Sequence, residues 1–244
     1  MRAFVRKKAK RFSEFWWGDT GLSMFLLLLF LLFFISPFLE SRLADILLST
    51  FLVLLLISGI LSVTDNKPLR IVAFVVAGSA MVLDILRQII PSTALNGWRL
   101  FFAAAFFFLL IYVLLSQVFR DGPVTAHRIR GAIAVYVLIG ITWALIYRLI
   151  ELVIPGAFSF PQSLAAHPDE HAYQSSLTYF SFVTMTTLGY GDILPVSPLA
   201  RVLVIFEALI GQLYPATLLA RLVSLEIASR QGSQPGAERK PGGA

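Results

Sequence analysis

Residues 184–192 read T-M-T-T-L-G-Y-G-D and contain the side chains and glycines best suited to binding an ion. Glycine at positions 189 and 191 allows the backbone to adopt positive φ angles, which ordinary residues avoid. Successive carbonyl groups can then point to one side, into a narrow passage. A cation that loses its water there meets several oxygen dipoles at once, and Thr187 can add its hydroxyl oxygen. The segment is a candidate cation-binding loop, and the alternative is a glycine-rich turn between two hydrophobic helices.

The core of this stretch, 187–191, resembles the T-V-G-Y-G selectivity filter of the tetrameric potassium channels, with leucine in place of valine. By motif and topology the resemblance covers about 126–225, under half of the chain. It implies that leucine 188 packs behind the filter, where it changes the support of the filter without displacing the carbonyl groups. It also implies that K⁺ is held by backbone carbonyls, together with the Thr187 hydroxyl, in a site made of Thr187, Leu188, Gly189, Tyr190 and Gly191.

The composition places this loop in a membrane protein rather than a soluble one. Hydrophobic residues make up 57% of the 244 and charged residues 14%, whereas charged residues are about 25% of ordinary soluble domains. The absence of cysteine excludes disulfides and thiolate chemistry. Because no catalytic triad, phosphate-binding glycine loop or metal-ligand quartet is found, we do not expect an enzyme.

Six hydrophobic segments are long enough to cross a bilayer, whose hydrocarbon core of about 30 Å needs about 20 apolar helical residues. We expect these spans at about 21–38, 43–63, 71–90, 100–119, 131–154 and 199–225. Residues 173–186 are helical in pattern but would reach only about 21 Å, so this segment is expected to be re-entrant. The predicted fold is an all-α membrane protein with six transmembrane helices, one re-entrant pore helix and a selectivity-filter loop.

These segments divide the chain into five parts. Residues 1–20 form a basic and aromatic N-terminus, and 21–119 form a four-helix bundle. A linker at 120–130 precedes the pore domain at 131–225, which comprises an outer helix, the pore helix, the filter and an inner helix. The Gly-, Pro- and Ser-rich tail at 226–244 is expected to be disordered.

The lysines and arginines predict the orientation. Most of the 20 lie on one side if the N-terminus is cytoplasmic, as the positive-inside rule requires. Both termini are then cytoplasmic, and the pore loop faces outward from the inner or plasma membrane. This distribution explains the net charge of +6 without nucleic-acid binding.

The four-helix bundle resembles a voltage sensor only in its number of helices. Its fourth span has Arg99 at the outer end and no further arginine before Arg120, whereas voltage sensing needs several regularly spaced charges. We therefore expect a bundle that does not sense voltage. Asp45, Asp84 and Arg87 are its internal ionisable residues. The last two lie three positions apart on one helical face and are either a functional charge pair or, as we favour, a structural one.

The last span carries the residues expected to gate and line the pore. Gly211 resembles the glycine at which the inner helix of the family bends, and Pro215 removes a backbone hydrogen bond one turn later. The alternative is that small residues here permit close helix packing. One stripe of this helix is expected to line the cavity: Ala208, Gln212, Pro215 and Leu219.

Glu207 lies deep in the same span but off this stripe. An acid within the membrane is costly and is a functional hypothesis by default. We expect it to support the filter from behind by bonding to hydroxyls such as those of Ser181 or Thr184, and the alternative is a charge that faces the cavity. Thr184, Thr186 and Asp192, which flank the filter, are also expected to support it.

Two further groups have unspecialised interpretations. An aromatic belt with a snorkelling arginine explains the residues near the outer end of the fifth span, which are Trp143, Tyr147, Arg148 and Glu151. His167 and His171 have metal-ligand spacing beside Asp169 and Glu170, but a solvated outer loop is the better interpretation.

The resemblance implies passive conduction of K⁺ by a homotetramer embedded in the lipid bilayer, because four copies of the loop are needed to surround an ion. Two alternatives stay open: a non-selective cation channel of the same architecture, and a non-conducting membrane subunit or transporter component. The sequence does not indicate what stimulus opens the channel.

Overall fold

The computed structural model describes residues 67–90, 92–119, 125–161 and 170–232. Within these ranges the elements follow in the order α4 (Lys67–Ile89), α5 (Thr93–Val118), α6 (Ala126–Val153), β1 (Phe158–Ser159), α8 (Glu170–Met185), β2 (Leu194–Pro195) and α9 (Pro198–Gly232). The expected spans at 21–38 and 43–63, the N-terminal segment and Asp45 lie outside the described residues.

Local sequence explains where two of these helices begin. Thr125 precedes α6, and its hydroxyl accepts a hydrogen bond from the Arg128 amide at 3.4 Å. Ser197 precedes α9 in the same way and accepts from the Ala200 amide at 3.2 Å. Proline fits the first position of α9, because an amide hydrogen at that position would have no acceptor within the helix and proline lacks one.

Three of the helices are long and apolar enough to cross a membrane, and the chain is a membrane protein. They comprise Thr93–Val118, Arg128–Val153 and Pro198–Ile227, and the apolar part of α4 is shorter, at Ile71–Leu86. Together with α4 they match the four later spans predicted from the sequence. Helix α8, with 16 residues, extends about 24 Å and is too short to cross the hydrocarbon core.

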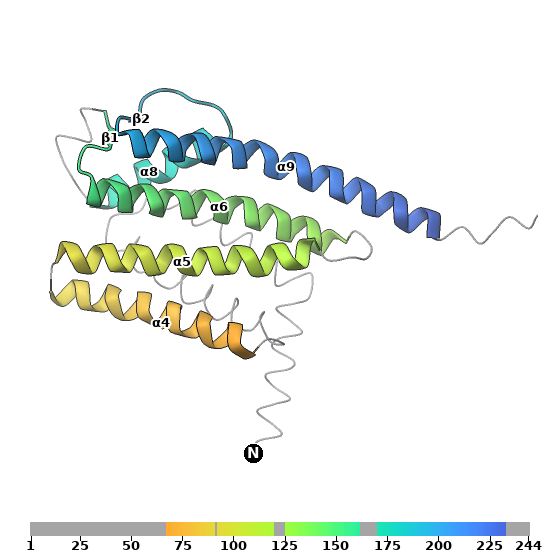
Figure 1. Cartoon of the computed structure of the whole chain (residues 1–244), viewed down its shortest axis with the longest axis horizontal. Coiled ribbons are helices and arrows are strands. Elements are labelled where there is room, and N and C mark those ends of the chain that lie inside the picture. The colour runs from red at the N-terminus through yellow and green to blue at the C-terminus, as the bar shows by residue number, and fades with distance from the viewer. Residues whose placement is uncertain (1–66, 91, 120–124, 162–169, 233–244) are drawn as a thin grey trace, which may run out of the picture.

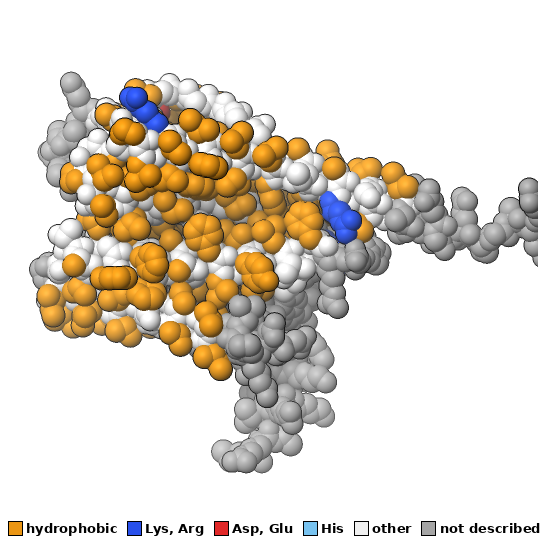
Figure 2. Space-filling model, viewed as in Figure 1, with side chains coloured by type: hydrophobic (Ala, Val, Ile, Leu, Met, Phe, Trp, Pro, Cys, Tyr) orange, Lys and Arg blue, Asp and Glu red, His pale blue; other side chains and the backbone are white. Residues whose placement is uncertain are grey.

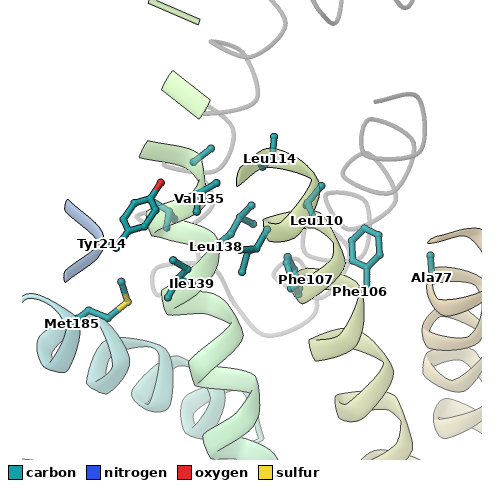
Figure 3. Close-up of a cluster of buried hydrophobic side chains, with 13 residues drawn as sticks. Ala77, Phe106, Phe107, Leu110, Leu114, Val135, Leu138, Ile139, Met185 and Tyr214 are labelled. Atoms are coloured by element: carbon teal, nitrogen blue, oxygen red, sulfur yellow. The ribbon is translucent and has the colours of Figure 1, made fainter. Parts of the chain in front are cut away.

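The long helices lie side by side in the order α4, α5, α6, with α9 along the other flank of α6 (Figure 1). Helix α8 packs against both α6 and α9 near one end of the bundle. The core between α5 and α6 continues toward α8 and α9 (Figure 3). Its buried side chains include Phe106, Phe107, Leu110, Leu114, Val135, Leu138, Ile139, Met185 and Tyr214.

Helix α9 is longer than predicted. It continues to Gly232, so residues 226–232, which were expected in a disordered tail, are helical. The segment Leu225 to Ala228 contains good helix formers, and these favour extension of the helix beyond the last long apolar run. Large apolar side chains are exposed along this helix and along α4, and Figure 2 shows hydrophobic side chains over much of the visible face.

The bundle contains an ion pair between neighbouring helices. Arg99 of α5 lies with Nη1 3.9 Å from Oδ1 of Asp84 on α4. The sequence interpretation placed Asp84 beside Arg87 on one helix, and the side chain of Arg87 lies outside the described residues. The described partner of Asp84 is therefore on the next helix.

Candidate functional site

Helix α8 ends in a hydrogen-bonded turn that starts the candidate filter, the stretch of residues 187–192. The Thr187 amide donates to the Thr184 carbonyl at 3.0 Å, and the Leu188 amide donates to the Val183 carbonyl at 2.9 Å. This pair of bonds is the Schellman pattern, whose first residue past the helix adopts a left-handed conformation. Thr187 occupies that position with a φ of 58°. The backbone therefore leaves α8 abruptly and enters the filter stretch.

The backbone of the filter stretch alternates in conformation. Gly189 has a φ of 57° and Gly191 a φ of 78°, as the glycine spacing predicts. A β-carbon on either glycine would meet no atom within 4 Å in the single chain, so the backbone angle rather than lack of space requires glycine. The positive φ of Thr187 was not foreseen, because a β-branched residue rarely adopts it.

The filter side chains are open to the surroundings in one chain. Leu188 is 54% exposed and Tyr190 66% exposed. Leucine 188 was expected to pack behind the filter, and no side chain of the described single chain encloses it. The rings of Tyr190 and Tyr179 are stacked, with centroids 6.4 Å apart.

Asp192 ends the filter stretch and is held by two donors. Its Oδ1 accepts from the Ile193 amide at 3.1 Å, and its carboxylate also accepts a hydrogen bond from the Tyr179 hydroxyl. Loss of hydration, followed by this bond and the charge of Asp192, raises the pKa of Tyr179 to about 12. A phenol is protonated at neutral pH, and the Tyr179 hydroxyl therefore links Asp192, at the end of the candidate filter, to α8.

Gln212 lies beside Thr187, at the start of the candidate filter. Its Nε2 donates to the Thr187 hydroxyl oxygen at 3.4 Å, while that hydroxyl donates to the Thr186 carbonyl at 2.7 Å. Thr186 in turn donates to the Phe182 carbonyl at 2.7 Å. Of the other residues on the predicted stripe, Ala208 is half-buried, and Pro215 and Leu219 are exposed.

Glu207 is fully enclosed between three helices. It is 0% exposed, and its two carboxyl oxygens are hydrogen bonded to the hydroxyls of Tyr147 on α6 and Ser181 on α8. The predicted contact with Ser181 is present. Tyr147 was interpreted as part of an aromatic belt, but it is 0% exposed and faces inward. Its role depends on which side of α6 meets α9, which the sequence does not specify.

Gly211 lies against the end of the pore helix. A β-carbon on Gly211 would be 2.4 Å from the Met185 carbonyl oxygen, a distance that no side chain can occupy. The Tyr136 hydroxyl also approaches that oxygen, at 3.4 Å. This geometry supports the packing interpretation of Gly211. Helix α9 continues through Pro215, which has no amide hydrogen to donate to the Gly211 carbonyl.

Tyr214 fixes the next turn of α9 to α6. Its hydroxyl donates to the Ala132 carbonyl at 2.9 Å, and its ring stacks on Tyr136 with centroids 6.1 Å apart. Helix α9 is therefore attached to α6 and α8 on three successive helical turns, at Glu207, Gly211 and Tyr214.

The loop after α6 is organised by Glu151. Its carboxylate accepts from the amides of Gly156 at 2.8 Å and Phe158 at 3.0 Å, and from the Tyr173 hydroxyl at 3.3 Å. The Arg148 guanidinium lies 5.0 Å from the centre of the Tyr173 ring. These contacts give Arg148 and Glu151 partners that the belt interpretation did not assign.

Two short strands pair the segment after α6 with the segment after the candidate filter. Strands β1 and β2 are antiparallel, with Phe158 opposite Pro195 and Ser159 opposite Leu194. The loop that precedes α8 is thereby joined to the segment that follows the filter.

The predicted histidine pair, His167 and His171, lies outside the part of the chain whose side chains are described. His167 and Asp169 lie outside the described residues, as do the side chains of Glu170 and His171. Among the residues that are described, no three His, Cys, Asp or Glu side chains form a group able to hold a metal ion.

Residues 149–227 match the model of an ion channel family. The chain is similar to the inward rectifier potassium channel Kirbac3.1 of Paramagnetospirillum magnetotacticum, with 37% identity over 82 residues, which are 31% of this chain and 28% of that protein. It is also similar to Protein LctB of Bacillus caldotenax, with 30% identity over 88 residues, which are 36% of this chain and 64% of that protein. Each match thus covers less than two thirds of the relative. No solved structure matches the chain significantly.

Proposed function

We propose that this chain forms a K⁺-selective channel, because residues 149–227 match the model of an ion channel family and part of the chain is similar to a bacterial potassium channel. The observation that carries the proposal is the filter stretch itself. It follows directly on a short helix, and three of its residues, Thr187, Gly189 and Gly191, have positive φ angles. This backbone presents successive carbonyl oxygens to a dehydrated cation.

The ion path is made by four copies of the chain in this proposal. One filter stretch surrounds only part of an ion, and closed rotational symmetry arranges identical loops about an axis. The exposed side chains of Leu188 and Tyr190 then contact neighbouring copies. The C-terminal ends of the four α8 helices carry partial negative charge, which favours a cation on the axis below the filter. Conduction is passive, and the chain sits in the cell membrane with both termini in the cytoplasm.

Ion flux through the purified chain in liposomes tests this function. With equal gradients, K⁺ should cross and Na⁺ should be largely excluded. Gly189→Ala should abolish selective flux, because alanine disfavours a φ of 57°. Gly156→Ala is a matched control, since Gly156 also has a positive φ of 79° with no atom near a built β-carbon but lies in the outer loop.

The results separate the possible functions. Equal K⁺ and Na⁺ flux in the unmodified chain would identify a non-selective cation channel. No flux in a correctly folded chain would favour a non-conducting subunit. Native mass measurement in detergent should give four chains per particle, and a stable monomer or dimer would contradict the assembly.

A further inference from the structure

Three oxygen–oxygen contacts connect α6, α8 and α9 behind the filter. The Tyr147 hydroxyl contacts one carboxyl oxygen of Glu207, and the Ser181 hydroxyl contacts the other. The Ser181 oxygen also lies 2.8 Å from the Gly140 carbonyl oxygen. All three side chains, Tyr147, Ser181 and Glu207, are 0% exposed, so water does not complete these bonds.

Each of these contacts requires one proton between its two oxygens. The Gly140 carbonyl only accepts, and the hydroxyls of Tyr147 and Ser181 have one proton each. Two protons cannot serve three contacts. If Ser181 donates to Gly140, its contact with Glu207 is favourable only when the carboxyl supplies the third proton.

A charged Glu207 would have no cationic partner among the described residues. Among the described residues, the Glu207 carboxyl forms no ion pair with a lysine or arginine. The groups that face it are hydroxyls, from Tyr147 and the more distant Tyr136 on α6 and from Ser181 on α8. A buried carboxylate without a cation is costly, whereas a neutral acid that donates and accepts is satisfied.

We propose that Glu207 carries its proton and acts as a positioning residue for the pore helix, as a neutral acid in a directed chain of hydrogen bonds. Tyr147 donates to Glu207, Glu207 donates to Ser181, and Ser181 donates to the Gly140 carbonyl. These hydrogen bonds fix α8 between α6 and α9 at Ser181, four residues before Met185, the last residue of α8. They do not depend on which ion crosses the filter, so their test is independent of the proposed channel activity.

Infrared spectroscopy of the purified full chain tests the proton directly. A protonated carboxyl group has a C=O stretch that is separate from the bands of carboxylates and that shifts in D₂O. The difference spectrum between the unmodified chain and Glu207→Gln at neutral pH should show one such band lost per chain. Loss of a carboxylate band instead would overturn the proposal.

Glu151→Gln is the matched control. Glu151 accepts three hydrogen bonds, from two amides and the Tyr173 phenol, and therefore needs no proton of its own. Its replacement should leave the protonated-carboxyl band in place. If the band disappears in Glu151→Gln but not in Glu207→Gln, the proton is on Glu151, and the inference is refuted.

Stability provides a second measurement. Glutamine can accept from Tyr147 through its oxygen and donate to Ser181 through its nitrogen, so Glu207→Gln should unfold close to the temperature of the unmodified chain. Glu207→Ala leaves both hydroxyls without this partner and should unfold at a clearly lower temperature. If Gln destabilises the chain as much as Ala does, the carboxyl is required as a charge and the proposal fails. If both variants fail to fold, Ser181→Ala serves instead, because it should shift the frequency of the Glu207 band without removing it, and an unshifted spectrum would contradict the hydrogen-bond chain.

Discussion

Gly211 of α9 lies so close to Met185 of α8 that a β-carbon on the glycine would be 2.4 Å from the Met185 carbonyl oxygen. The contact joins α9 to the last residue of α8, two residues before Thr187, where the candidate filter starts. Helix α9 is thus held at the position where the sequence predicted a bend.

We expect Gly211→Ala to destabilise the chain by about 1–3 kcal/mol, because the added methyl group forces α9 away from rigid backbone. Thermal unfolding in detergent measures this loss. Gly78→Ala on α4 is the control, since no atom lies within 4 Å of its built β-carbon, and there alanine favours the helix. Equal stability of the two variants would show that Gly211 is not a packing contact.

Thr187 has a left-handed backbone conformation, with a φ of 58°, that costs an L-residue about 1–2 kcal/mol. Thr187→Gly removes this cost and also removes the hydroxyl. We therefore expect the variant to be at least as stable as the unmodified chain, which thermal unfolding measures. We also expect it to bind K⁺ more weakly, which a K⁺ titration measures. Thr187→Ser retains the hydroxyl and should bind K⁺ better than the glycine variant. A glycine variant with undiminished K⁺ binding would exclude a role for the hydroxyl.

The open probability should depend weakly on membrane potential. Arg99 is the one charged residue in α5, and it is paired with Asp84 on α4. Steep voltage dependence needs several charges that move through the field, and neither partner of a single ion pair supplies them. Conductance–voltage recordings in planar bilayers measure the slope. A slope equivalent to several charges per chain would contradict the prediction, and charges outside the described residues would then have to be responsible.

Glu151→Gln should loosen the outer loop, because two backbone amides and the Tyr173 hydroxyl all donate to this carboxylate. An amide oxygen accepts more weakly, and its NH₂ group would face donors. We expect a loss of about 1–3 kcal/mol and faster amide exchange at Gly156 and Phe158. Tyr173→Phe removes one donor and should cost less. Exchange rates that do not change would show that the carboxylate does not hold the loop.

Much of this architecture follows from local sequence. Long apolar runs separated by Pro, Gly and charged residues predict α4, α5, α6 and α9, and the short run before the filter predicts α8. The contact between Glu207 and Ser181 could also be predicted, because a buried acid needs hydroxyl partners and few are available.

Other contacts depend on which helix faces meet, and a single sequence does not specify that. Tyr147 lies 60 positions from Glu207 in the chain, and its aromatic ring fits a membrane belt as well as a buried site. The ion pair between Asp84 and Arg99 on the neighbouring helix likewise depends on how the helices pack.

Helix α9 has 35 residues and is about 52 Å long, well beyond the hydrocarbon core of about 30 Å. Its first half is attached to α6 and α8 up to Tyr214, and most of the side chains described after it, from Pro215 to Ile227, are exposed. The proline lacks one backbone hydrogen bond at the boundary between the two halves. We therefore expect α9 to bend at Pro215: a force on its C-terminal end should move the half after Pro215, while the half beside the candidate filter stays in place.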